Sequence, residues 1–188
     1  MNTKQINDMI KKVILITFLL SSIFNYAQDS ISGVENHQFK FNLLITPSIE
    51  YEMRLTKNTS LALQLGTELW AIENGLTGKT RWGLYLNADA YYRYYYNFKR
   101  RTRKGKNTLN NSANFVGILA KYIHTDPIIG DTPPDDAYYA HVGPVYGLQR
   151  TFWKRFNLAF DIGIAYAFSD IQSEITPIGD ITLGWVLK

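Results

Sequence analysis

The residues best suited to acid–base or metal chemistry are the three histidines, His37, His124 and His141. His124 lies two residues before Asp126, and His141 follows the acidic, proline-containing segment Thr125–Asp136. Such groups would suit a metal site or a histidine-based hydrolase, but no His-Glu-x-x-His spacing or serine-nucleophile motif accompanies them. The acidic segment also lacks the spacing of a calcium loop, which leaves only weak cation binding open. We therefore assign no catalytic, cofactor-binding or metal residue, and we expect a non-enzymatic protein without a cofactor.

The densest charge in the chain is the run Lys99–Lys106, which holds six of the 20 lysines and arginines. Its basic members are Lys99, Arg100, Arg101, Arg103, Lys104 and Lys106. The run is suited to contacts with anionic lipid phosphates at a membrane edge, and the alternative is a solvated turn that tolerates charge. The rest of the chain after residue 27 is net acidic, so the basic pI of about 9.1 reflects this cluster. No nucleic-acid partner is expected.

A second set of ionisable residues lies in the middle of segments in which polar and apolar residues alternate. These residues are Glu50, Glu52, Glu68, Asp89, Arg93, Lys121 and Asp161, accompanied by the amides Asn42, Gln64 and Asn87. Charges are costly to bury unless they pair with one another. The interior of a barrel of eight strands is just wide enough for side chains to fill it. We therefore expect a polar network that plugs the lumen, with a narrow ion path as the alternative.

The elements that must position these residues are β-strands, because alternation recurs along the chain and helical periodicity is scarce. The predicted strands are Phe39–Ile45, Ser48–Met53, Thr59–Trp70, Trp82–Tyr96, Ala113–His124, Ala137–Gln149, Phe156–Phe168 and Ile181–Leu187. In each strand one face carries large apolar groups and the other carries small or charged groups. A soluble barrel would bury the large face, whereas a transmembrane barrel turns it to lipid. Long strands, aromatic residues near strand ends and mid-strand charges favour the transmembrane barrel.

Two of these segments alternate less regularly than the others. In Ala137–Gln149 we place Val142 and Val145 on one side, with Pro144 interrupting the pattern. In Ala113–His124 the alternation is weakest, and we place Gly117 and Lys121 on one face.

The connections between the strands alternate in length, as in bacterial outer-membrane barrels. We expect periplasmic connections at Arg54–Asn58, Asn97–Asn111 and Trp153–Arg155, and outer loops at Glu73–Arg81, Thr125–Asp136 and Ser169–Gly179. Pro47 separates the first two strands, because a proline cannot donate a hydrogen bond within a ladder. Two strands there bring the total to eight, the even number that such a barrel requires.

The chain begins with an export signal. Lys4, Lys11 and Lys12 precede the apolar run Val13–Leu20, and the small residue Ala27 follows at the expected cleavage point. The apolar run is shorter than the roughly 20 residues of a membrane-spanning helix, and an uncleaved inner-membrane anchor is the alternative. We expect a cleaved signal peptide over 1–27, a short N-terminal segment over 28–37 and the barrel over 38–188.

Several segments of the chain resemble small outer-membrane β-barrel proteins of unknown function from Gram-negative bacteria. The resemblance rests on Phe41–Leu44, Tyr51–Glu52, Arg54–Leu61, Tyr92–Asn97 and the closing strand Ile181–Trp185. In architecture the chain is similar to the transmembrane domain of outer-membrane protein A. One departure is the final residue, Lys188, where such proteins commonly end in an aromatic residue.

Together these observations predict an all-β protein, an eight-stranded antiparallel transmembrane β-barrel with meander topology in the cell outer membrane. The expected partners are outer-membrane lipids, together with lipopolysaccharide or periplasmic components. We expect a structural, adhesive or surface-interaction role. One alternative is an outer-membrane lipid-modifying enzyme on the same scaffold, which would need a nucleophile and a base at one rim. The other is a soluble secreted ligand-binding β-barrel, in which the large apolar rows would point inward.

Overall fold

A computed structural model describes residues 33–43, 46–73, 80–130 and 137–187. These residues belong to the unit Ser32–Lys188, the second of the two units into which the chain divides. The expected signal peptide and most of the expected outer loop Glu73–Arg81 lie outside the described residues.

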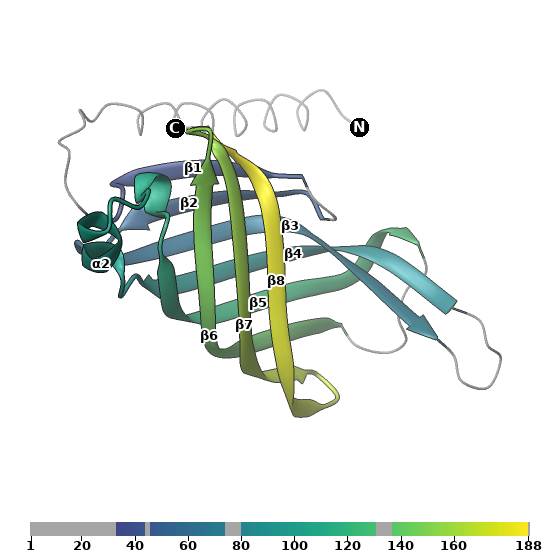
Figure 1. Ribbon diagram of the computed structural model, residues 1–188. Helices are drawn as coiled ribbons and strands as arrows, with labels where there is room; N and C mark the ends of the chain where they lie inside the picture. The colour runs from purple at the N-terminus through teal and green to yellow at the C-terminus, as the bar shows by residue number, and fades with distance from the viewer. Residues whose placement is uncertain (1–32, 44–45, 74–79, 131–136, 188) are drawn as a thin grey trace, which may run out of the picture. The chain divides into compact units, whose positions relative to one another are not determined.

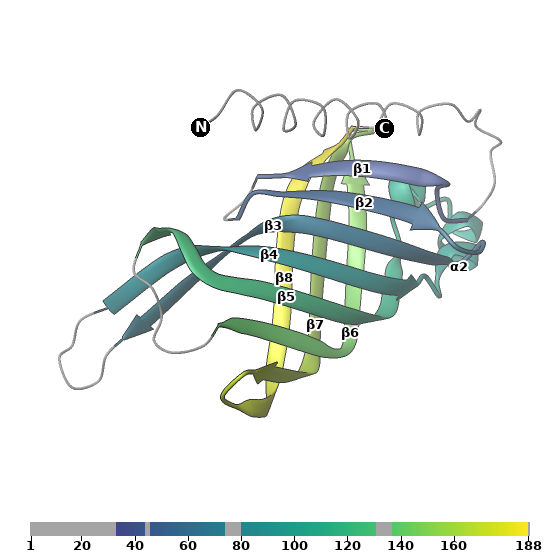
Figure 2. The same ribbon diagram turned by 180° about the vertical axis from the view of Figure 1, so that it is seen from behind.

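Within the described residues, eight antiparallel strands follow one another in a meander and close into a ring (Figures 1 and 2). In chain order they are β1 (His37–Asn42), β2 (Ser48–Arg54), β3 (Thr59–Glu73), β4 (Thr80–Tyr94), β5 (Asn114–Gly130), β6 (Tyr138–Phe152), β7 (Phe156–Ser169) and β8 (Ser173–Val186). The ring closes where β1 pairs with β8, from Lys40 opposite Val186 to Asn42 opposite Gly184. A Cβ atom at Gly184 would lie 2.1 Å from the carbonyl oxygen of Phe41, so this close approach requires a glycine. The predicted strand count, antiparallel order and division at Pro47 are confirmed.

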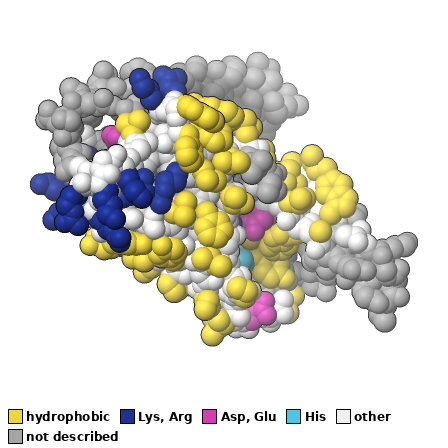
Figure 3. Space-filling view, in the orientation of Figure 1, with side chains coloured by type: hydrophobic (Ala, Val, Ile, Leu, Met, Phe, Trp, Pro, Cys, Tyr) yellow, Lys and Arg dark blue, Asp and Glu magenta, His cyan; other side chains and the backbone are white. Residues whose placement is uncertain are grey.

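The two faces of the strands separate large apolar side chains from small and polar ones. On β7, Phe160, Ile162 and Ile164 are exposed, whereas Asp161 and Ala165 are buried. This is the two-residue period of a strand with one face turned into the ring and the other turned outward. Exposed apolar side chains accordingly cover much of the surface in Figure 3. The predicted facing of the large apolar row is confirmed for this strand.

Two expected outer loops are wrong in extent, because strands occupy much of them. β5 continues to Gly130, inside the expected loop Thr125–Asp136, and β8 begins at Ser173, inside the expected loop Ser169–Gly179. Prolines in the first of these segments suggested a loop. Pro127 instead lies on β5 opposite Tyr85, at a shift in strand register. Pro177 lies on a part of β8 that pairs with β7 but has no described strand neighbour on its other edge. Bulges and sheet edges are the positions at which strands tolerate proline.

The expected grouping of Val142 with Val145 is also wrong. Val142 is exposed and Val145 is buried, because β6 runs regularly through Pro144 and residues three apart then fall on opposite faces. On β5, Gly117 and Lys121 do share a face, which is the inward one.

One connection folds into short helical elements. Between β4 and β5 lie α2 (Phe98–Arg103) and the 3₁₀ turn η1 (Leu109–Asn111). Asn110 and Asn111 in the turn have φ angles of 49° and 60°, a left-handed region that asparagine adopts more readily than most residues. Because the strands form a meander, α2 lies at the same end of the ring as the β2–β3 and β6–β7 turns (Figure 1). No helix of the described residues is long and apolar enough to cross a membrane.

Candidate functional site

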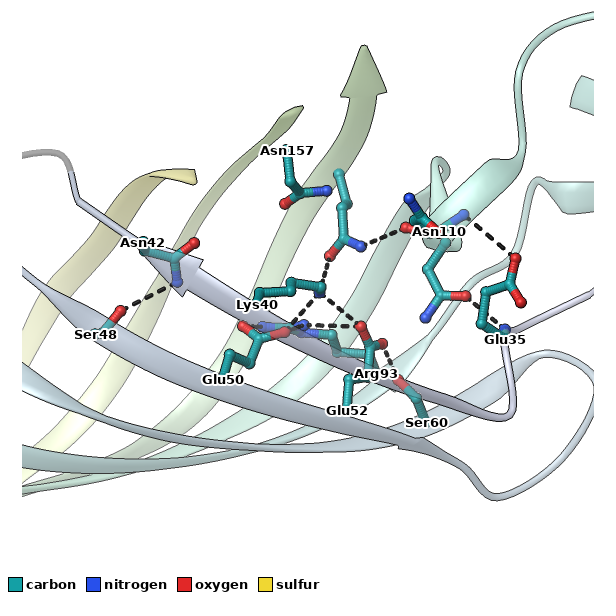
Figure 4. Close-up of polar contacts among 12 residues, drawn as sticks. Glu35, Lys40, Asn42, Ser48, Glu50, Glu52, Ser60, Arg93, Asn110 and Asn157 are labelled. Atoms are coloured by element: carbon teal, nitrogen blue, oxygen red, sulfur yellow. Dashed lines mark hydrogen bonds and ion pairs between the residues drawn. The ribbon is translucent and has the colours of Figure 1, made fainter. Parts of the chain in front are cut away.

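A buried network of four charged residues lies inside the ring near the α2 end (Figure 4). Lys40 Nζ lies 2.6 Å from Glu50 Oε1 and 2.8 Å from Glu52 Oε2. Arg93 contacts both oxygens of Glu50, with Nη1 at 2.9 Å and Nη2 at 3.1 Å. All four residues are at most 3% exposed. Two cations thus balance two carboxylates, so the network carries no net charge.

Neutral side chains add further hydrogen bonds to this network. Gln149 Oε1 accepts a hydrogen bond from Lys40 Nζ at 2.9 Å. Ser60 and Tyr95 each donate to Glu52 Oε1 at 2.6 Å. Tyr95 lies just after β4, where burial and the negative charge of Glu52 raise the pKa of its phenol well above the usual value. The phenol therefore stays protonated and remains a donor.

Aromatic rings pack around the network and fill this end of the ring. The guanidinium carbon of Arg93 lies 4.4 Å from the ring centre of Tyr91 and 5.1 Å from that of Phe115. Tyr95 packs against Phe115 and against Phe98 of α2, with ring centres 5.6 Å and 5.2 Å apart. These rings are almost fully buried. The first residue of α2 thus joins the interior core.

Hydrogen bonds fasten the β4–β5 connection across the end of the ring. Asn110 Nδ2 donates to the carbonyl of Lys154 in the β6–β7 turn at 2.9 Å, and Gln149 Nε2 donates to the carbonyl of Asn110 at 2.7 Å. Asn107 Nδ2 donates to the carbonyl of Thr151 at 2.7 Å. The connection therefore joins the interior network to β6 and the β6–β7 turn.

A second polar cluster lies further along the interior, away from α2. Lys121 Nζ donates to Glu68 Oε2 at 2.8 Å and lies 3.7 Å from Asp89 Oδ2. Asp161 is buried, and its register partner across the β7–β8 ladder is Asp180. The seven ionisable residues singled out from the sequence thus fall into two groups. One group is Glu50, Glu52 and Arg93, and the other is Glu68, Asp89, Lys121 and Asp161.

Sequence reasoning missed important members of both groups. Lys40 alternates with Phe39 and Phe41, so the two-residue period already indicated that it points inward. Asp180 was hidden because the segment before it was expected to be a loop. Gln149 gave no signal, since its role depends on how the connection after β4 folds over it.

The predicted anionic-lipid cluster lies on and just after α2 and forms a blue patch on the surface in Figure 3. Five of its members are exposed: Lys99, Arg100, Arg103, Lys104 and Lys106. Arg101 differs, because its Nε and Nη2 atoms donate to the carbonyl of Asn107 at 3.2 Å and 2.8 Å. Partial burial lowers the pKa of Arg101 from its usual value. Arg101 therefore holds the connection together, while the other five cations face outward.

The histidines are not brought together. His124 Nε2 lies 3.3 Å from Asp126 Oδ2 on the surface, His37 Nδ1 lies 2.7 Å from the Tyr51 hydroxyl, and His141 lies on β6. The described residues contain no group of three or more histidine and acidic side chains that could hold a metal ion. The remaining aspartates of the acidic segment, at positions 131, 135 and 136, lie outside the described residues.

Comparison with known proteins places the chain by family. No curated protein and no solved structure matches it. One family model matches residues 13–174, which is most of the chain. The protein therefore belongs to the family described as protein of unknown function, DUF3575.

Proposed function

We propose that the protein is an integral β-barrel of the bacterial outer membrane, exported by way of a cleaved signal peptide. The observation that carries this proposal is the outward apolar surface, to which every strand contributes an exposed large residue. One example from each strand in turn is Phe41, Ile49, Leu65, Leu86, Ile118, Val142, Ile162 and Ile181. Such a surface is unfavourable in water and favourable against lipid tails.

The backbone also supports a position in lipid. Hydrocarbon offers no partner to backbone N–H and C=O groups, so a closed ring of strands is one of the few arrangements that can cross it. Strands β3 to β8 have 14 to 17 residues. A tilted strand needs about 9–11 residues to cross a bilayer.

The filled interior supports a role other than that of a wide pore. The neutral network around Lys40 and Arg93, the aromatic layer and the fastened β4–β5 connection occupy the α2 end. We therefore propose a structural, adhesive or surface-interaction role without enzymatic activity.

The α2 end has the composition of a membrane edge. Exposed aromatic residues lie near strand ends there, among them Tyr94, Tyr96, Trp153 and Trp185. Aromatic belts of this kind mark membrane–water interfaces. The exposed cations of α2 lie just beyond, where they would contact lipid phosphates. With the C-terminus in the periplasm this is the periplasmic edge, and in the inverted orientation the cations would meet lipopolysaccharide phosphates.

The soluble ligand-binding barrel is less well supported. It would need the large apolar rows to point into a cavity, whereas Leu65 and Ile164, for example, are 68% and 59% exposed.

Arginine substitutions on the outward row test the proposal. Leu86→Arg and Ile162→Arg should each impair assembly into the outer membrane, because a charge near the bilayer midplane costs about 2–4 kcal/mol. The measurement is the amount of folded protein recovered from outer membranes.

The matched control is Ile171→Arg. Ile171 is 63% exposed but lies in the connection between β7 and β8, so the same substitution should leave assembly unchanged. Equal assembly of Ile162→Arg and Ile171→Arg would argue against lipid contact on the outward face.

A further inference from the structure

The wall of the ring is interrupted beside the short β1–β2 hairpin. Pairing between β2 and β3 ends at Ser48 opposite Gly66, and pairing between β1 and β8 ends at Asn42 opposite Gly184. The last backbone hydrogen bonds on either side are Thr67 N to Pro47 O and Leu43 N to Leu183 O. Beyond them, residues 68–73 of β3 and 173–182 of β8 have no described strand neighbour on the sides of the hairpin.

A cavity of about 450 Å³ lies at this interruption. Its lining includes Glu68 and Asp180, which follow the inward period, and also their neighbours Leu69 and Ile181, which are exposed on the outward face. A cavity lined by both faces of the same strands must pass through the wall. In Figure 3, acidic side chains are visible between apolar surfaces.

The interior side of the opening has more negative than positive charge. Lys121 lines the cavity and pairs with Glu68. Asp161 and Asp180 lie directly opposite each other on β7 and β8, and neither forms an ion pair with a described residue. Like charges at directly opposed positions destabilise a sheet, and a cation between them would relieve this repulsion.

Two buried acceptors lack a hydrogen-bond donor: one lines the cavity, and the other lies directly across the β7–β8 ladder from Asp180 of the lining. Asn87 lines the cavity and is 6% exposed, yet its Oδ1 accepts no hydrogen bond from any described residue. Asp161 is 5% exposed, and its Oδ1 likewise accepts none. A buried acceptor without a partner is costly, so these atoms point to a ligand that brings hydrogen-bond donors.

We propose that the opening between β3 and β8 binds an amphiphile with a primary ammonium head and an apolar tail. The head lies inside the ring among Asp161, Asp180 and Asn87, where it supplies both positive charge and hydrogen-bond donors. The tail leaves the ring over Leu69 and Ile181. Entry of this ligand from the bilayer rests on the proposed membrane location, whereas the site itself rests only on the fold.

A titration of the purified full chain tests the site. The isotopically labelled protein, folded in a neutral maltoside detergent, is titrated with dodecylamine and followed by NMR. We expect saturable shifts of the amide signals of Gln64, Asn87 and Gly179, which surround the cavity. Dodecanol and dodecanoate, which lack the ammonium group, should cause no saturable shift at these positions.

Two matched variants assign the binding to the paired carboxylates. The double variant Asp161→Asn with Asp180→Asn should weaken dodecylamine binding by about ten-fold or more, because it removes the charges that face the head. Asp126→Asn makes the same chemical change on the outer surface, where the carboxylate pairs with His124, and should leave binding unchanged. Heat-modifiable gel mobility verifies that each variant is folded.

Three results would overturn the proposal. The first is equal binding of dodecanol, which would show an apolar groove without head-group recognition. The second is wild-type affinity in the folded double variant. The third is displacement of dodecylamine by millimolar Ca²⁺ acting at the two carboxylates, which would identify a divalent-cation site. A chain that binds dodecylamine but is recovered in the soluble fraction would contradict the membrane proposal alone.

Discussion

At the scale of single residues, Lys40, Glu50, Glu52 and Arg93 determine how the interior is filled. Their contacts join β1, β2 and β4 inside the ring, and each partner compensates the desolvation of another. Breaking a buried ion pair is much more damaging than never having one, because the remaining charge stays buried alone.

Lys40→Met therefore should destabilise the folded chain strongly. The substitution leaves Glu50 and Glu52 with Arg93 as their only cation among the described residues, which should cost about 3–5 kcal/mol. Denaturant unfolding of the protein in lipid vesicles measures the change.

The control is Lys57→Met, which removes an exposed lysine and should change stability by no more than about 0.5 kcal/mol. Adding Glu52→Gln to Lys40→Met should restore part of the loss, since the amide still accepts from Ser60 and Tyr95. If the double variant loses more free energy of unfolding than the two single variants lose together, the pairing of Lys40 with Glu52 is contradicted.

The sequence indicated the inward direction of these residues better than it indicated their partners. Alternation places Glu50, Glu52 and Arg93 on the polar face, and the same rule includes Lys40. Which carboxylate meets which cation depends on the register between strands and on the curvature of the ring. Neither quantity is encoded in the period of a single strand.

At the scale of elements, the β4–β5 connection combines a structural and a surface role. Its inner side carries Phe98 and Asn110 into the ring, while its outer side exposes five cations. The charged run is plain in the sequence, but its helical conformation was not predicted. The reason is that α2 has only six residues and is held in place by contacts with the ring.

Replacing Arg100, Arg103 and Lys104 by glutamine should weaken the preference of the reconstituted protein for anionic lipid. Each cation near an anionic surface contributes about 1 kcal/mol, and the effect should fade at high salt. Spin-labelled phosphatidylglycerol and phosphatidylcholine measure this preference.

Arg101→Gln is the comparison, because Arg101 already donates to the carbonyl of Asn107. This variant should lower the stability of the connection and largely retain the lipid preference. If the triple variant selects phosphatidylglycerol as strongly as the wild type, the α2 cations do not contact anionic lipid.

Strand ends were harder to predict than strands, for a physical reason. The expected loops included Pro127 and Pro177, yet a register shift and an unpaired edge accommodate these two residues within strands. Such tolerance depends on the neighbouring strand, so it is invisible in a local pattern.

At the scale of the whole molecule, the sequence predicted eight strands in meander order because alternation and the position of Pro47 agreed with the parity of a closed ring. It did not predict that the β1–β2 hairpin is too short to pair along the full edges of β3 and β8. The interruption arises from strands of unequal length meeting at the closure. It is this interruption that opens the interior to the outward face.

Contact between lipid and the outward apolar rows of the ring can be tested by locating the protein in cells. Cells are fractionated, and the gel mobility of the protein is compared with and without boiling. We expect recovery in the outer membrane with a mobility that changes on heating, as for a folded barrel. Recovery as a soluble protein whose mobility does not depend on heating would contradict lipid contact.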